Sequence, residues 1–448
     1  MILLAYYGDD FTGSTDALEA LTTSGVETVL FTEPPSAEML VRFPNVRAIG
    51  VAGNSRTMSP EQMDQALPGV FESLLARGPA IVHYKVCSTF DSSPRIGSIG
   101  RAIEIGHRLF QNRAVPLVVG APHLQRYCLF ANLFARSGLD SPVYRLDRHP
   151  TMREHPVTPM TEPDLRVHLS HQTSLPVRLV DVLTLNRGVA TAAAAVQSEG
   201  GIVLFDTLTN EHLTTIGQLI WAAHEREQKP SFVAGSSGIE SALTKHWQAS
   251  GLVPSESKGF APLPPVDRVV VVSGSCSPVT GRQIAWALAN GFAEVPLDTA
   301  RLVQSSALEA AIRDVAIRVA TELDAGRSVI VHTSRGPDDD RITTIKQSLP
   351  HGLNAGALGV ILGRILGDVL RSRPVERVAV AGGDTSGAVA REIGIDALEI
   401  VGPLAPGAPL CVAHSRHAEV EGVQFTFKGG QVGHDDFFGT LLRGGPNR

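Results

Sequence analysis

Residues 378–387, Val-Ala-Val-Ala-Gly-Gly-Asp-Thr-Ser-Gly, decide the fold of the second half of the chain. An apolar run ends there in a glycine-rich turn that precedes a helical pattern, which predicts a buried strand, a tight turn and a helix. Glycine lets the main chain approach an anion closely, and the free N–H groups at a helix start point towards it. We therefore expect this turn to bind phosphate, with the hydroxyls of Thr385 and Ser386 as further donors.

A similar strand, polar turn and helix are predicted at the amino end, where residues 7–16 read Tyr-Gly-Asp-Asp-Phe-Thr-Gly-Ser-Thr-Asp. Here the turn carries three carboxylates, Asp9, Asp10 and Asp16. Carboxylates accept hydrogen bonds from sugar hydroxyls, and one could accept a proton from an attacking hydroxyl. The structural alternative is that Asp10 or Thr12 only caps the helix and that Asp16 is exposed.

The composition indicates a globular protein of two or three domains. The chain has 448 residues, 43% of them hydrophobic, and a formal net charge of −6 without a block of like charges. This balance favours neither nucleic acid nor an anionic membrane as a partner. No apolar run approaches the roughly 18 residues of a membrane span, so a cytoplasmic enzyme is expected. The four cysteines lack the spacing of a zinc site or a disulfide framework and are expected to be reduced: Cys87, Cys128, Cys276 and Cys411.

Apolar runs alternate with helical patterns along the whole chain, which predicts an α/β fold. The stretch 251–267 is rich in Pro, Gly and Ser, so we place domains at 1–255 and 266–448. Each is expected to be a mostly parallel sheet flanked by helices, with an active-site cleft between the two domains. A proline-rich stretch, 142–163, is predicted to be an ordered loop excursion. Expected strands are 2–7, 27–31, 48–53, 80–86, 116–120, 268–273, 328–333, 377–381 and 398–401, expected helices are 308–323 and 355–370, and 409–428 is expected to form two antiparallel strands.

Polar residues follow the strands at 48–53 and 80–86. Arg56, after the first of these, could form a bidentate pair with a substrate carboxylate, or it could be a surface arginine. Because consecutive strands usually neighbour one another, their polar ends should build one hydrophilic pocket. The predicted substrate-binding residues are Asp9, Asp10, Thr12, Asp16, Asn54, Ser55, Arg56, Lys85, Ser88, Thr89, Asp91 and Ser92.

Three glycine- or serine-rich turns are predicted in the second domain. None is a Walker A or a Rossmann GxGxxG sequence, and each alone could be structural, but together they favour a phosphate ligand. Asp384 could position Mg²⁺ or could cap a helix, and both readings stay open. The predicted nucleotide-binding residues are Ser273, Gly274, Ser275, Ser277, Gly382, Gly383, Asp384, Thr385, Ser386, Gly387, Lys428, Gly429, Gly430 and Gly433.

Over nearly its full length the chain resembles the four-carbon acid sugar kinase family, which includes 3-oxo-tetronate and D-threonate kinases. The resemblance implies that the amino-terminal domain holds a short sugar acid, that the carboxyl-terminal domain holds ATP, and that the reaction occurs between them. Carried over by position, Asp10, Arg56, Lys85, Ser88 and Asp91 fall in the acid-sugar loops, and Ser275, Gly383 and Gly430 fall in the nucleotide loops. The matching segments are 8–14, 54–56, 85–92, 155–160, 273–277, 382–387, 405–409 and 428–433.

The chain also departs from the family pattern, mainly in the substrate loops. Residues 93–99 and 120–127 differ from the 3-oxo-tetronate branch, and Gly-Gly-Asp replaces the frequent Gly-Gly-Glu. The segment 144–149 is not part of the branch pattern, so Arg145, Arg148 or His149 could read a different or larger acid. The identity of the acid is therefore left open.

We expect phosphoryl transfer from Mg-ATP to a hydroxyl of a small sugar acid, with catalysis by positioning and charge stabilisation. Arg56 and Lys85 would neutralise negative charge, and an aspartate, Asp10 ahead of Asp91 and Asp16, would orient or deprotonate the hydroxyl. Two alternatives stay open: an NAD-dependent hydroxy-acid dehydrogenase and a non-catalytic sugar-acid sensor. A homodimer is expected because symmetric dimers are the commonest oligomers.

Overall fold

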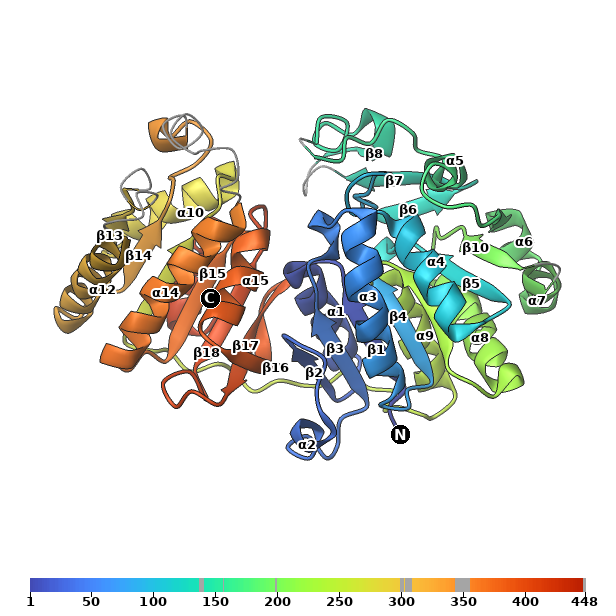
Figure 1. Cartoon of the computed structure of the whole chain (residues 1–448), viewed down its shortest axis with the longest axis horizontal. Coiled ribbons are helices and arrows are strands. Elements are labelled where there is room, and N and C mark those ends of the chain that lie inside the picture. The colour runs from blue at the N-terminus through green and yellow to red at the C-terminus, as the bar shows by residue number, and fades with distance from the viewer. Residues whose placement is uncertain are drawn as a thin grey trace. The chain divides into compact units, whose positions relative to one another are not determined.

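The computed structural model describes residues 1–136, 141–155, 157–197, 200–298, 302, 308–342 and 355–445. The chain forms two compact units, which are coloured along the sequence in Figure 1. The first comprises Met1–Val29 and Pro34–Lys258, and the second comprises Leu30–Glu33 and Gly259–Arg448. Within the described residues, no helix combines the length and the apolar character needed to cross a membrane.

The first unit is built on a parallel sheet, as the alternating pattern predicts. Its strands are short, buried and apolar, so helices must cover both faces. Because all strands point the same way, their carboxyl ends meet at one edge of the sheet. In spatial order the strands are β3 (Ala48–Ala52), β1 (Leu4–Gly8), β4 (Ile81–Lys85), β11 (Ser231–Gly235), β5 (Ala114–Val118), β10 (Gly201–Phe205) and β9 (Val177–Val180).

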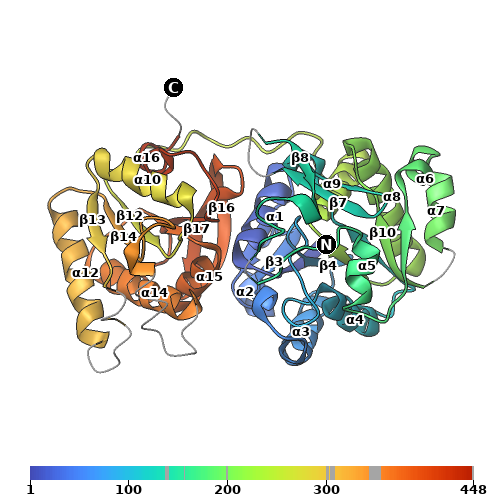
Figure 2. The ribbon, with the colours of Figure 1, turned by 90° about the horizontal axis from the view of Figure 1, so that it is seen from above.

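Helices cover the two faces of this sheet: α3 and α4 lie on one face, and α1, α8 and α9 on the other (Figure 2). Phe71 of α3 anchors the first face, with its ring centroid 6.4 Å from that of Tyr7, 6.2 Å from Tyr84 and 5.3 Å from Phe232. The helices are α1 (Phe11–Thr23), α2 (Ala37–Leu40), α3 (Pro60–Leu75), α4 (Ile99–Phe110), α5 (Leu165–Ser170), α6 (Val182–Asn186), α7 (Val189–Gln197), α8 (Asn210–Glu227) and α9 (Gly238–Ala249).

A small antiparallel sheet accompanies the first unit: β6 (Arg126–Leu129), β7 (Asn132–Arg136) and β8 (Val143–Arg145). The predicted loop excursion at 142–163 therefore begins with a strand. The strand was not predicted because the segment is rich in proline, which disfavours strands. β8 is an edge strand, and edge strands tolerate nearby proline.

The second unit has a mixed sheet. Five parallel strands, β13 (Ala293–Pro296), β14 (Val329–His332), β12 (Val269–Ser273), β15 (Arg377–Ala381) and β18 (Gln424–Lys428), are followed by antiparallel β17 (Ala408–Ser415) and β16 (Ile395–Ala405). The antiparallel pair predicted at 409–428 is confirmed, and β16 is longer than the predicted strand at 398–401. The helices are α10 (Pro278–Ala289), α12 (Leu308–Asp324), α14 (Ala355–Ser372), α15 (Gly383–Glu392) and α16 (Phe437–Arg443).

One strand was not predicted fully. The run at 27–31 was expected to be a parallel strand, and it forms β2 (Thr28–Phe31), but Leu30 and Phe31 pair antiparallel with Leu398 and Ala397 of β16. Residues 30–33 thereby group with the second unit. A buried apolar strand has the same sequence pattern in either orientation, so the pairing could not be read from residue types.

Candidate functional site

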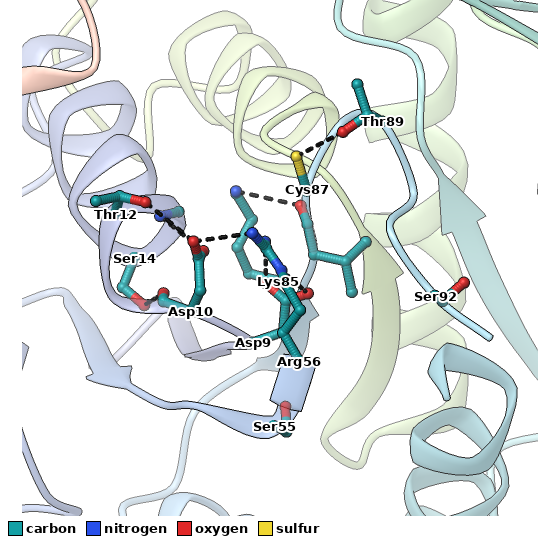
Figure 3. Close-up of polar contacts among 12 residues, drawn as sticks. Asp9, Asp10, Thr12, Ser14, Ser55, Arg56, Lys85, Cys87, Thr89 and Ser92 are labelled. Carbon is teal, nitrogen blue, oxygen red and sulfur yellow. Dashed lines mark hydrogen bonds and ion pairs between the residues drawn. The ribbon is translucent and has the colours of Figure 1, made fainter. Parts of the chain in front are cut away.

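Arg56 joins two acidic residues at the carboxyl edge of the first sheet (Figure 3). It lies in a 3-10 turn directly after β3. Its Nη2 and Nε donate to the carboxylate of Asp9 at 2.8 and 3.2 Å, and its Nη1 donates to Asp10 Oδ2 at 2.9 Å. Arg56 is therefore not a surface arginine, and its forked edge is already occupied by Asp9 rather than free for a substrate carboxylate.

Burial sets the electrostatics of this group. Asp9 is almost completely buried, and burial raises its pKa to about 6, although the Arg56 guanidinium acts in the opposite direction. Burial alone would lower the pKa of Arg56, but the charges of Asp10 and Asp9 more than compensate and hold it well above its usual value. The guanidinium thus stays charged, while the raised pKa of Asp9 lies at about 6.

Asp10 is the N-cap of α1, as the structural alternative proposed. Its side chain accepts hydrogen bonds from Gly13 N and from Thr12 Oγ1, both at 2.9 Å, in addition to the bond from Arg56. Three donors therefore already occupy this carboxylate. Capping and ion pairing therefore occur together.

Lys85 ends β4 beside these residues and is buried. Its Nζ donates to Val86 O at 3.2 Å and lies 3.5 Å from Asp16 Oδ2. Burial would lower the pKa of Lys85, but Asp16 and then Glu240 outweigh it and raise that pKa. The Asp16 side chain is 25% exposed, and Lys85 is its one ion-pair partner among the described residues. Of the three acids in the turn, Asp16 is the most accessible.

The remaining predicted substrate residues divide into two groups. Ser55 and Ser92 are buried and support the loops: Ser55 Oγ is 2.9 Å from Tyr84 Oη, and Ser92 Oγ donates to Phe90 O at 3.0 Å. Asn54 is exposed, and Ser88, Thr89 and Asp91 are partly exposed in the loop after β4.

Sequence reasoning missed a buried pair beneath Lys85. Nδ1 of His83, in β4, lies 3.0 Å from Oε1 of Glu240 in the first turn of α9, and both side chains are fully buried. His83 Nε2 also lies 3.1 Å from Gly235 O. Strand alternation could have placed His83 on the same face as Lys85, two residues later. Nothing in the sequence pointed to Glu240 as its partner.

The three predicted turns of the second unit come together at one sheet edge, because they follow the adjacent parallel strands β12, β15 and β18. Gly382 has φ 121°, and an added Cβ would lie 3.0 Å from Thr385 Oγ1 and 3.4 Å from Ser275 N. A Cβ on Gly430 would lie 2.9 Å from Ser275 Oγ. Only glycine permits this close approach of main chains.

Helix starts supply the donors at these turns. Ser277 caps α10, whereas Gly382 caps α15 without a side-chain hydrogen bond, which leaves first-turn N–H groups for an anion. Ser386, predicted as a hydroxyl donor, is buried, and its Oγ donates to Gly382 O at 2.8 Å. Asp384 is exposed in the first turn of α15 and is not its N-cap.

Lys428 lies within the turns and does not extend from them. It is fully buried, and its Nζ donates to Thr280 Oγ1 at 3.1 Å and to Gly429 O at 3.0 Å. Burial lowers the pKa of Lys428 to about 7. A positive charge can therefore appear or disappear beneath the predicted phosphate site near neutral pH.

A pocket of about 760 Å³ adjoins the start of α10. Its walls come from α10 and from the segment that follows β14, and the volume is in the range that holds a small-molecule ligand. Gly281 allows the two walls to meet, because an added Cβ there would lie 2.3 Å from Arg335 O. The lining residues are Pro278, Gly281, Arg282, Ala285, Arg335, Gly336, Pro337, Asp338, Asp339, Asp340 and Arg341.

Comparison with known proteins matches each half of the chain to a known domain family. Residues 4–243 match the model of a sugar-binding N-terminal domain, and residues 270–438 match that of a nucleotide-binding C-terminal domain. The chain is 48% identical to the 3-oxo-isoapionate kinase of Paraburkholderia graminis over 452 residues, covering 99% of this chain and 94% of that protein. It is 32% identical to a 3-oxo-tetronate kinase of Methylobacterium radiotolerans over 449 residues, covering 98% and 99%.

Two solved structures share the fold. A protein of Salmonella typhimurium LT2 superposes with a TM-score of 0.77 at 24% identity, over 99% of both chains. The Haemophilus influenzae protein HI1011 superposes with a TM-score of 0.71 at 22% identity, over 98% of both chains. The full-length sequence matches and the two matched domains lead to one conclusion: the chain belongs to the four-carbon acid sugar kinase family, whose members join a sugar-binding N-terminal domain to a nucleotide-binding C-terminal domain.

Proposed function

We propose that this kinase transfers the γ-phosphoryl group of ATP to a hydroxyl of 3-oxo-isoapionate or a close structural relative. The observation that supports this substrate is the 48% identity to a 3-oxo-isoapionate kinase along almost the whole chain. The 3-oxo-tetronate kinases are 28–32% identical, and the substrate loops at 93–99 and 120–127 depart from the pattern of that branch. Phosphorylation of a sugar acid by ATP is common to both readings.

The two units divide the work. The loops after β1, β3 and β4 hold the acid, and the turns after β12, β15 and β18 hold the ATP phosphates. The pocket beside α10 begins at Pro278 and has room for the nucleoside. Phosphoryl transfer needs little covalent chemistry from the protein, so fixed positions and matched charges carry most of the rate.

Asp16 is the better candidate than Asp10 for the residue that accepts the proton of the attacking hydroxyl. Asp10 already accepts three hydrogen bonds, whereas Asp16 is partly exposed and contacts the Lys85 ammonium. Lys85 would hold Asp16 in place and stabilise negative charge on the transferring group. Arg56 would fix the loops through Asp9 and Asp10.

Mg²⁺ fits the second unit as a partner of ATP and not as a resident ion. The described residues contain no cluster of three or more His, Cys, Asp or Glu side chains that could hold a metal. Mg²⁺ keeps several waters and binds through one or two carboxylates plus substrate phosphates. The exposed carboxylate of Asp384, in the first turn after the phosphate turn, would hold the ion, which would neutralise charge on the phosphates.

A panel of acids tests the function directly. Purified protein, Mg²⁺ and ATP are incubated with 3-oxo-isoapionate, 3-oxo-tetronate, threonate or erythronate, and ADP release is measured. We expect the highest kcat/KM with 3-oxo-isoapionate. The second candidate, a 3-oxo-tetronate kinase, is favoured instead if the four-carbon acid gives the higher value. ADP release at the same rate with and without acid would contradict both candidates and indicate an ATPase, whereas no ADP release with any acid would leave a non-catalytic sensor.

Three further points remain proposals. ATP, and not NAD, should raise the melting temperature, since the amino-terminal turn carries carboxylates that would repel a pyrophosphate. The homodimer and the cytoplasmic location remain predictions, and light scattering of the purified protein tests the dimer.

A further inference from the structure

Arg126 begins the hairpin of β6 and β7 at the edge where the substrate loops lie. Its main-chain N–H donates to Ala121 O at 3.2 Å, and its carbonyl accepts from Ala121 N at 2.9 Å. Ala121 follows β5, so the hairpin starts from the carboxyl edge of the parallel sheet. The loops after β1, β3 and β4 leave from the same edge.

The far end of the hairpin is fixed to that edge as well. Asp206, directly after β10 and fully buried, accepts from Phe130 N at 2.7 Å and from Ala131 N at 3.0 Å. Phe130 and Ala131 adopt positive φ values of 49° and 66°, so the turn is held in a shape that these residues rarely take. Figure 1 shows β6, β7 and β8 gathered at one end of the first unit. Arg126 therefore sits on a framework that is held at both ends.

The guanidinium of Arg126 has one edge engaged and one edge available. Its Nη1 donates to the carbonyls of Leu124 and Gln125 at 3.2 and 3.4 Å. Its Nε is buried, and no hydrogen-bond partner for it exists among the described residues. Buried donors are nearly always paired, and a charged one is costly to leave unpaired. Nε and Nη2 form the edge that matches the two oxygens of a carboxylate.

The other candidate cations are occupied. Arg56 pairs with Asp9 and Asp10, and Lys85 donates to Val86 O and contacts Asp16. Arg145, one of the three residues that could read the acid by sequence, donates to both oxygens of Asp147 at 2.7 and 2.8 Å.

The two other residues that could read the acid by sequence are also poor candidates. Arg148 is 72% exposed, and the ring nitrogens of His149 contact main-chain groups. Of the cations considered as partners for the substrate carboxylate, Arg126 is the one with a buried, unpaired N–H donor, its Nε.

The loop after β4 lies within electrostatic reach of this guanidinium. Burial lowers the pKa of Arg126, and Cys87 and Asp91 act against that effect. Oδ1 of Asp91 is also buried without a hydrogen-bond partner in the described part of the chain. We propose that Arg126 binds the carboxylate of the sugar acid, with Nε and Nη2 donating to its two oxygens, while Asp91 accepts from a substrate hydroxyl. This assignment rests on the proposed function.

Kinetics of Arg126→Ala with two substrates tests it. One substrate is 3-oxo-isoapionate, and the other is the neutral analogue in which CH₂OH replaces the carboxylate. The KM for the acid should rise roughly 10- to 100-fold, the size expected for a lost charge-assisted contact. The KM for ATP should stay within twofold, and the kcat/KM for the neutral analogue should not change. Added methylguanidine should restore part of the affinity for the acid.

Arg166→Ala is the matched control, because Arg166 is an exposed arginine of the same unit that pairs with Asp164. An unchanged KM for the acid in Arg126→Ala, or equal losses with the acid and the neutral analogue, would overturn the proposal. If Arg126→Ala fails to fold, Arg126→Lys carries the test: it keeps the charge, loses the paired donors, and should raise only the KM for the acid. Absence of turnover in the unsubstituted protein would instead contradict the proposed function.

Discussion

Arg56 holds Asp9 in a forked ion pair, with Nη2–Oδ1 and Nε–Oδ2 distances of 2.8 and 3.2 Å, and its remaining Nη1 reaches Asp10. This relationship ties the loop after β3 to the turn after β1. Asp9 is almost completely buried, so loss of the Arg56 charge would leave its carboxylate desolvated and unpaired. The site of the first unit therefore depends on the protonation of Asp9.

Activity should fall on the acidic side of about pH 6. Burial raises the pKa of Asp9 to about 6, so Asp9 is ionised and paired above that pH and protonated below it. Loss of the charge weakens its hold on Arg56, so kcat/KM should decrease as the pH drops from 7 to 5. A pH profile of Asp9→Asn should lack this limb and run at a uniformly lower level. An identical limb in the variant would contradict the assignment.

Asp16→Asn and Asp10→Asn should differ. We expect Asp16→Asn to lower kcat about 10²- to 10⁴-fold, the usual effect of removing a general base. Asp10→Asn should cost less, because asparagine still caps α1 and can accept from Gly13 N. Circular dichroism would check that both variants are folded. If Asp10→Asn lowered kcat more than Asp16→Asn, Asp10 would be the better candidate for the general base.

Breaking the buried contact between His83 and Glu240 should destabilise the first unit. Loss of one partner from a buried polar contact typically costs about 1–3 kcal/mol. Glu240→Gln should therefore lower the free energy of unfolding by that order, measured by urea denaturation. The double variant His83→Leu/Glu240→Leu serves as the control and should recover most of the loss. If the double variant lost as much stability as His83→Leu and Glu240→Leu together, the two side chains would not be coupled.

Binding of ATP should be accompanied by proton uptake at pH 8. Burial lowers the pKa of Lys428 to about 7, so most molecules carry a neutral Lys428 at that pH. Phosphate placed at the neighbouring turns favours the charged form and raises its pKa again. Calorimetry in buffers of different ionisation enthalpy should show uptake of up to about one proton per ATP. Lys428→Met should remove this uptake, and equal uptake in both proteins would refute the role of Lys428.

Gly274→Ala should damage nucleotide binding. An added Cβ would lie 2.2 Å from Thr385 Oγ1, so the turns after β12 and β15 would have to separate. We expect the KM for ATP to rise at least tenfold, with a small change in the KM for the acid. Gly69→Ala, in α3, is the control, because no atom lies within 4 Å of its added Cβ. It should leave both values unchanged and slightly increase stability.

The sequence predicted the α/β class and the antiparallel pair at 409–428, because these depend on apolar periodicity, and it predicted the family through motifs that match the family in the same order along the chain. The partners of charged side chains were harder to predict. From the sequence, Arg56 could pair with a substrate carboxylate or lie at the surface, yet Asp9 lies within its reach and pairs with it. Ser386 was predicted to donate its hydroxyl to phosphate, but Ser386 Oγ donates to the carbonyl of Gly382, the N-cap of the same helix. The residue type alone does not show which acceptor a serine uses. The place of each predicted site residue in catalysis stays a prediction.

The measurement that tests the central claim most directly is ³¹P NMR of a reaction that contains the protein, Mg-ATP and 3-oxo-isoapionate. We predict one new phosphomonoester resonance that grows in a 1:1 ratio with ADP and requires the acid. Inorganic phosphate as the sole phosphorus product besides ADP, at a rate independent of the acid, would contradict it.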